Sequence, residues 1–284
     1  MIRKILSLCA AAFLAGPMTG VAGVVNDVSS CYSRERVGIE PAAPGTELFV
    51  LIDQTVVLDD NLRATVMEDI SPFIRHGKAY TVATFSAFSQ GRYLQIVSSG
   101  YIEPAIPDAQ RDDVSRRVLD SFDVCMARQE STARKHVVEV LNAALNAASQ
   151  SLERSEILAS LLEFSQRVRV STAREKVVLL ISDTLENSTV SSFYANNSVR
   201  RLNVSQELKK VESTGLFADF SGARVYVIGA GLLSARAGAN SHASAGYRDS
   251  ITLRRLADFW SGYFKRSNGD LRGFGDPALL VPVK

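Results

Sequence analysis

Two short apolar runs in this chain each lead into an aspartate, one at Asp53 and the other at Asp183. The runs, residues 48–52 and 177–181, have the length and composition of buried parallel strands. In an open α/β sheet ligands bind at the carboxyl ends of the strands, so both carboxylates are expected at that edge. Thr55 follows Asp53 by two residues and adds a hydroxyl. These oxygens together indicate a site for a hard cation or a phosphate.

A simpler interpretation of each aspartate stays open at this point. Aspartate is a good helix cap and also closes tight turns through its side chain. One aspartate at the end of a strand would favour that interpretation, whereas two at matching strand ends favour it less.

Periodic apolar residues indicate the elements that must position these side chains. Residues 58–76 have the spacing of a helix, while residues 80–85 and 93–97 alternate like two strands joined by a short loop that contains Gly91. The two strands predict a hairpin, and therefore one antiparallel strand at the edge of the sheet. Further segments with helical spacing are residues 112–128, 136–148, 156–168, 205–213 and 251–264.

Two more strands are predicted, at residues 223–228 and 279–283. The second contains Pro282, which would remove a hydrogen bond inside a sheet, so we place this strand at an edge. Strands that alternate with helices predict an α/β sandwich in which helices cover both faces of the sheet.

The first 23 residues have the composition of a secretory signal peptide. Arg3 and Lys4 precede an uncharged apolar stretch that is too short to span a bilayer as a helix. We expect an arm over residues 24–46 and one domain over residues 47–284, with a helical insert around residues 105–150. No later segment is apolar enough to be transmembrane, so the predicted location is the periplasm or the exterior.

Charge and cysteine content narrow the class of protein further. The formal net charge of +2 falls to zero once Arg3 and Lys4 are removed, which argues against a nucleic-acid partner. The remaining cysteines, Cys31 and Cys125, are the number that one disulfide requires in an oxidising compartment. Two unpaired buried thiols are the alternative.

The order of elements, together with Asp53, Thr55 and Asp183, resembles the von Willebrand factor A (vWA) domain. This resemblance implies a three-layer sandwich with a mostly parallel six-stranded sheet, one antiparallel edge strand and the strand order 3-2-1-4-5-6. It also implies a site for Mg²⁺ that keeps an open position for an acidic group of a partner protein. The residues that match the ligands of the family are Asp53, Thr55, Ser155 and Asp183, whereas Val57 stands where a second serine is expected and offers no oxygen.

Two of these residues also fit a different role. Ser155, which is followed by Glu156, is equally suited to cap the helix that begins there. Asp53 with Thr55 also resembles the start of phosphotransferases of the haloacid-dehalogenase type, in which the aspartate is a nucleophile and Mg²⁺ is required. That chemistry needs a basic residue near the phosphoryl group, but Lys176 precedes the second apolar run and lies at the wrong end of the sheet.

Loops that leave the same edge of the sheet form the expected docking surface for a protein partner. These loops are residues 54–60, 154–156 and 184–199. The last is polar but contains Phe193 and Tyr194, which are plausible anchors for a partner. The alternative is that Phe193 packs into the core.

Overall fold

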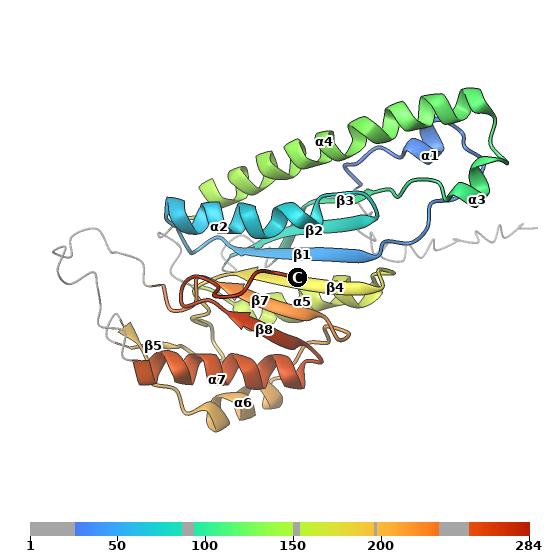
Figure 1. Cartoon of the computed structure of the whole chain (residues 1–284). Coiled ribbons are helices and arrows are strands. Elements are labelled where there is room, and N and C mark those ends of the chain that lie inside the picture. Colours follow the sequence, from blue (N-terminus) through green and yellow to red (C-terminus); the bar gives the residue numbers. More distant parts are fainter. Residues whose placement is uncertain (1–25, 87–93, 150–153, 196–197, 233–249) are drawn as a thin grey trace, which may run out of the picture.

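The computed structural model describes residues 26–86, 94–149, 154–195, 198–232 and 250–284, and within them the main sheet has six strands (Figure 1). The strand order is β3-β2-β1-β4-β7-β8, and β3 alone is antiparallel to its neighbour. The predicted class of fold is therefore confirmed, and the first five predicted strands take their predicted places, whereas β8 takes the sixth. The strands are β1 (Thr46–Asp53), β2 (Lys78–Phe85), β3 (Leu94–Ile102), β4 (Glu175–Ile181), β7 (Arg224–Ile228) and β8 (Asp270–Phe274). A separate small hairpin consists of β5 (Tyr194–Ala195) and β6 (Ser198–Val199).

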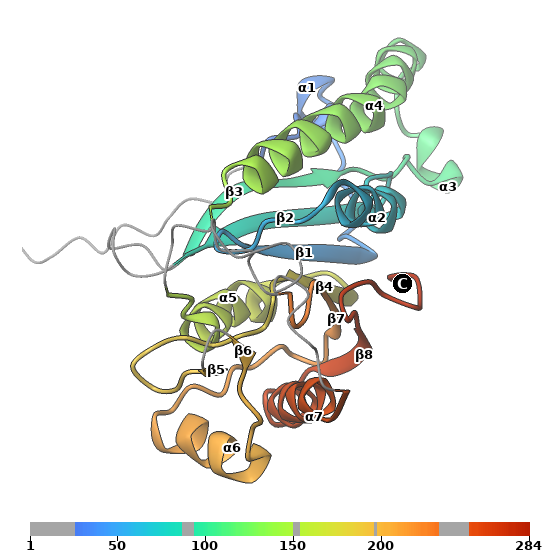
Figure 2. The same cartoon turned by 90° about the vertical axis from the view of Figure 1, so that its left-hand side faces the viewer.

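Helices cover both faces of the sheet, which makes the molecule a three-layer sandwich (Figures 1 and 2). Helices α2 (Asp60–Ile70) and α4 (Arg116–Asn146) lie on one face, and α5 (Ile157–Val170), α6 (Val204–Ser213) and α7 (Ser250–Arg266) lie on the other. The remaining helical elements are short: α1 (Cys31–Arg34), η1 (Ser71–Phe73) and α3 (Asp108–Arg111).

The middle parts of β1 and β4 are apolar at every position because both of their faces are covered. Along β1, Leu48, Val50 and Ile52 pack toward α2 and α4. The alternate residues Phe49 and Leu51 pack toward α5 and α7. This burial on both faces explains why β1 and β4 have continuous apolar runs in the sequence instead of an alternating pattern.

Helix α4 differs from the prediction, which divided this region into two helices. It is one helix of 31 residues, and its buried stripe continues through Gln129, Ala133 and Val137. Residues 128–136 contain neither glycine nor proline, so nothing in the sequence ends a helix there. The prediction of two helices was therefore wrong.

The last predicted strand, residues 279–283, is also wrong, because β8 forms the edge instead. Leu279 and Val283 pack against the core on the α2 side of the sheet. Gly273 in β8 makes this possible, since a Cβ atom there would lie only 2.7 Å from Leu279 Cδ2. Leu279 and Val283 therefore cover one face of the sheet near its edge, whereas Leu280 and Val281 are exposed.

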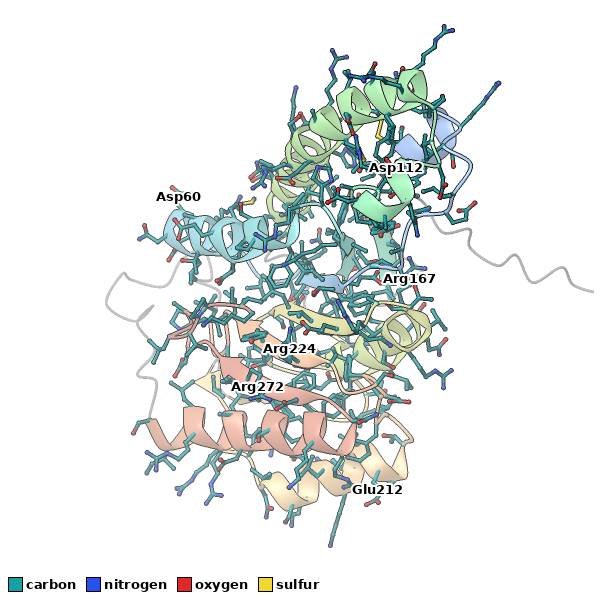
Figure 3. The ribbon with its side chains drawn as sticks, turned by 45° about the vertical axis from the view of Figure 1, so that its right-hand side comes forward. Asp60, Asp112, Arg167, Glu212, Arg224 and Arg272 are labelled. Carbon is teal, nitrogen blue, oxygen red and sulfur yellow. A yellow bond between two sulfur atoms is a disulfide. The ribbon has the colours of Figure 1, made fainter. Side chains whose placement is uncertain are left out.

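A disulfide joins Cys31 in α1 to Cys125 in α4, as predicted (Figure 3). It lies in a small separate core with Tyr32, Phe122 and Met126. The buried carboxylate of Glu103 accepts hydrogen bonds from the backbone N–H groups of Cys31 (2.7 Å) and Tyr32 (3.4 Å). The arm is thus attached to the domain by a covalent bond and by a satisfied buried charge.

The predicted signal peptide, residues 1–23, lies outside the described residues, which begin at residue 26. Among the described helices, none combines the length and apolar character that a membrane crossing requires.

Candidate functional site

The carboxylate of Asp53 is the centre of the candidate site. Its Oδ1 atom accepts hydrogen bonds from the backbone N–H (3.0 Å) and the hydroxyl (2.6 Å) of Thr55. Its Oδ2 atom accepts from the hydroxyls of Ser155 (2.9 Å) and Ser182 (2.8 Å). Asp53 is fully buried. Three hydroxyls from three separate segments therefore meet at one buried carboxylate.

The pairing of two parallel strands explains this convergence. Strands β1 and β4 are neighbours, and Ile52 lies opposite Ile181 in their register. The next residues, Asp53 and Ser182, therefore leave the sheet at the same level. Ser155 joins them from the segment before α5, where it forms a β-bridge with Asn187.

Asp183 is the second buried carboxylate of the site. Its Oδ1 atom accepts a hydrogen bond from the backbone N–H of Leu185 (2.8 Å), and its Oδ2 atom accepts from the hydroxyl of Tyr194 (2.8 Å). The bonds to Thr55 N and Leu185 N each close a turn two residues after the aspartate, as the simpler interpretation suggested. Each aspartate therefore closes a turn and also accepts a hydrogen bond from a hydroxyl of a distant segment.

Burial dominates the electrostatics of this pair. It raises the pKa of Asp183 to about 8, and the nearby negative charge of Asp53 adds to the increase. Burial also raises the pKa of Asp53, although its hydrogen bonds with Thr55, Ser182 and Ser155 oppose this increase. The two carboxylates interact and titrate as a unit. Near neutral pH, the pair retains a proton unless another positive charge replaces it.

Glu186 fixes the segment that supplies Ser155. Its carboxylate is buried and accepts a hydrogen bond from the backbone N–H of Leu158 (3.0 Å) in the first turn of α5. A negative charge is favourable at a helix N-terminus. Burial raises the pKa of Glu186 to about 7. The hydroxyl of Ser155 binds Asp53, and the cap residue of α5 is Glu156, so the capping alternative for Ser155 is not what the structure contains.

Thr184 has two unusual properties next to Asp183. Its φ angle is +61°, a conformation that β-branched residues rarely adopt. Its hydroxyl is buried and has no hydrogen-bond partner within the part of the chain that the structure describes. Its carbonyl accepts a hydrogen bond from Trp260 Nε1 (3.0 Å). Strained backbone and unsatisfied buried polar atoms are both concentrated at functional sites in proteins.

The donor set decides which ion the site suits. Asp53 and Asp183 supply carboxylate oxygens, and Thr55, Ser155 and Ser182 supply hydroxyl oxygens, with the unpartnered hydroxyl of Thr184 nearby. Oxygen donors of this kind fit Mg²⁺ or another hard cation, not a metal that prefers thiolate or imidazole. In the described residues, no three His, Cys, Asp or Glu side chains form a group that could hold a metal, so a cation here depends on hydroxyls.

Four of these five residues were predicted from the sequence. Thr55 and Ser155 bind Asp53, and Asp183 lies near enough for the charges of the two carboxylates to interact. Ser182 was missed as a site residue, although its position directly after the end of β4 could have indicated it. Val57, where the resembled family has a hydroxyl, is 42% exposed and does not contribute an oxygen.

The structure separates the two aromatic residues that were predicted to anchor a partner. Phe193 is fully buried, with its ring centroid 4.9 Å from that of Phe259 and 6.5 Å from that of Trp260. The prediction of Phe193 as an exposed anchor was therefore wrong, and the core alternative is correct. Tyr194 is only partly buried, and its hydroxyl binds Asp183.

No protein-family model matches this chain, and no curated protein matches it. The chemical role of the site is therefore inferred from its geometry. Among the described residues, the hydrogen-bond donors to Asp53 and Asp183 are hydroxyls and backbone amides. Lys176, the basic residue considered for phosphoryl transfer, lies at the start of β4 and thus at the opposite end of the strand from Asp183.

Proposed function

We propose that this chain is a secreted or periplasmic protein-interaction module similar to the vWA domain, and that it binds a partner protein through a divalent cation such as Mg²⁺. Asp53, Thr55, Ser155 and Asp183 would hold the cation, together with Ser182. The observation that carries the proposal is the convergence of the hydroxyls of Thr55, Ser155 and Ser182 on the buried carboxylate of Asp53.

Each side chain has a defined part in this proposal. A bound cation would supply a concentrated positive charge to which an acidic group of the partner can bind. The hydroxyls orient the carboxylate of Asp53, and the turn amides of Thr55 and Leu185 hold both carboxylates at the edge of the sheet. Because the site is buried in low-dielectric surroundings, the charge of a cation there would be less screened than at the surface.

The surrounding loops are the expected contact surface. Residues 54–60, 154–156 and 184–199 adjoin the site, and loops held by a rigid scaffold carry much of the binding function of proteins. With Phe193 in the core, the contacts would fall on exposed side chains of these loops, including Val57 and Asp59.

Calorimetric titration with Mg²⁺ and with Mn²⁺ tests the cation site. We expect binding by the wild type, loss of binding in Asp53→Asn, and at least roughly tenfold weaker binding in Ser155→Ala, since each good ligand contact contributes on the order of 1–2 kcal/mol. Asp60→Asn, which changes an exposed aspartate in the first turn of α2, is the matched control and should bind as the wild type does. Equal heats for the wild type and Asp53→Asn would contradict the proposal.

The interaction itself is tested by comparing proteins captured from a periplasmic extract on wild-type chain and on Asp53→Asn, each with and without EDTA. A partner that is retained only by the wild type, and only without EDTA, is the expected result. Hydrolysis of an aryl phosphate in Mg²⁺ buffer, lost in Asp53→Asn, would instead support the phosphotransferase alternative.

A further inference from the structure

Tyr194 is the side chain through which the buried site reaches the surface. It is partly exposed, whereas Asp183, to which its hydroxyl donates a 2.8 Å hydrogen bond, is only 3% exposed. A tyrosine hydroxyl has one proton to donate, and here Asp183 receives it.

Both carboxylates of the site are already engaged by donors of the chain. Asp183 uses Oδ2 for Tyr194 and Oδ1 for the backbone N–H of Leu185. The two oxygens of Asp53 accept from the hydroxyls of Thr55, Ser155 and Ser182. Serine and threonine hydroxyls keep lone pairs for a cation and can turn their protons away. The phenol of Tyr194 differs from them because it lies on a longer side chain that is partly exposed and packs against the edge of the core.

The backbone around Tyr194 is held on both sides. The N–H of Phe193 donates to the carbonyl of Glu186 (2.8 Å), and the N–H of Arg200 donates to the carbonyl of Phe193 (2.7 Å). The guanidinium of Arg200 also pairs with the buried carboxylate of Glu207 at 2.7 Å. With the ring of Phe193 in the core, the small β5–β6 hairpin is anchored at its base. Because the strand is held in this way, release of the Tyr194 hydroxyl would come from rotation of its side chain, whose ring packs against the core.

We propose that Tyr194 is a latch on the cation site: its hydroxyl and a divalent cation compete for the Oδ2 atom of Asp183, so that cation uptake requires the phenol to rotate away. This inference rests on the proposed cation site and adds the residue that limits its affinity. A hydrogen bond of this kind contributes enough that its loss before binding weakens affinity roughly twofold to tenfold.

The single tryptophan provides a reporter beside the site. Trp260 donates its indole N–H to the carbonyl of Thr184 (3.0 Å), the residue that follows Asp183. Its ring also packs near Phe193, which precedes Tyr194. Its fluorescence is therefore expected to change when the environment of Asp183 changes, and it gives a binding signal that is independent of calorimetric heat.

The experiment is a Mn²⁺ titration of the wild type, Tyr194→Phe and Tyr194→Leu, followed by calorimetry and by Trp260 fluorescence. Both variants keep an apolar side chain but lack the hydroxyl, and both should bind Mn²⁺ roughly twofold to tenfold more tightly than the wild type. Tyr101→Phe is the matched control, since it removes a hydroxyl that donates to the carbonyl of Ala42, and it should bind as the wild type does.

The Mn²⁺ titration tests the latch and the cation site separately. If the wild type binds Mn²⁺ and neither hydroxyl-free variant binds it more tightly, the latch is overturned and the cation site stands. If neither the wild type nor either variant binds Mn²⁺, the cation site and the latch are overturned together. Tighter binding in both variants, with Tyr101→Phe unchanged, supports the latch.

Discussion

Replacing Asp183 by asparagine should stabilise the protein at slightly alkaline pH in the presence of EDTA. Burial and the charge of Asp53 raise the pKa of Asp183 from 3.8 to about 8 in the folded state. An unfolded chain would release that proton near the ordinary value. Between about pH 4 and pH 8 the folded state therefore holds a proton that the unfolded state has lost, and stability falls as the pH rises through this interval.

The size of the effect follows from the same shift. A difference of about four pKa units corresponds to a loss on the order of 5 kcal/mol in the free energy of unfolding, reached at about pH 8. Asparagine does not ionise and avoids this loss. Its side chain has one acceptor oxygen, whereas two donors, Leu185 N–H and Tyr194 O–H, bind the carboxylate of Asp183. One buried donor is therefore left unpaired in the variant, which lowers the free energy of unfolding by about 1–3 kcal/mol. The net gain of Asp183→Asn at pH 8 should thus be roughly 2–4 kcal/mol.

Urea denaturation of the wild type and of Asp183→Asn at pH 5, 6, 7 and 8, with EDTA throughout, measures this directly. The difference between the two proteins should grow in favour of the variant as the pH increases. Asp60→Asn, at an exposed position, is the control and should follow the wild type at each pH. Parallel pH profiles for the wild type and Asp183→Asn would refute the idea that burial of this carboxylate dominates its pKa.

Two further predictions concern stability. Replacing Cys31 and Cys125 together by serine should lower the free energy of unfolding by up to about 5 kcal/mol in the chain-entropy model, because the bridge spans a sequence separation of 94; an unchanged urea midpoint would contradict this. Phe193→Ala should cost about 3–5 kcal/mol because it leaves a cavity beside Phe259 and Trp260. A melting temperature equal to that of the wild type would mean that Phe193 is not part of the core.

Local signals in the sequence were sufficient for much of the fold. Continuous apolar runs identified β1 and β4 because a strand covered on both faces needs apolar residues at every position. The glycine-bearing loop between two alternating segments identified the antiparallel edge. The disulfide followed from the number of cysteines, and Asp53 and Asp183 followed from their place after apolar runs. The order of the strands came from the resemblance to the vWA domain.

Errors arose where one local pattern fits two structures. Residues 279–283 form a short apolar segment, which suits an edge strand and equally suits a segment lying over a sheet. Their packing was decided by Gly273, whose missing side chain opens the space that Leu279 fills. A sequence pattern does not contain that pairing, because the two residues meet only after the chain turns back over β8.

Tertiary structure alone decided the partners within the candidate site. Which hydroxyls reach Asp53 depends on the register of β1 with β4 and on the path of the segment before α5, so Ser182 became a partner although it was not predicted as one. Likewise, the adjacent Phe193 and Tyr194 take opposite roles, one in the core and one on Asp183, because successive side chains of an extended segment point to opposite sides. Composition and spacing determined which residue types were available at this edge of the sheet; the long-range packing of loops determined which of them touch.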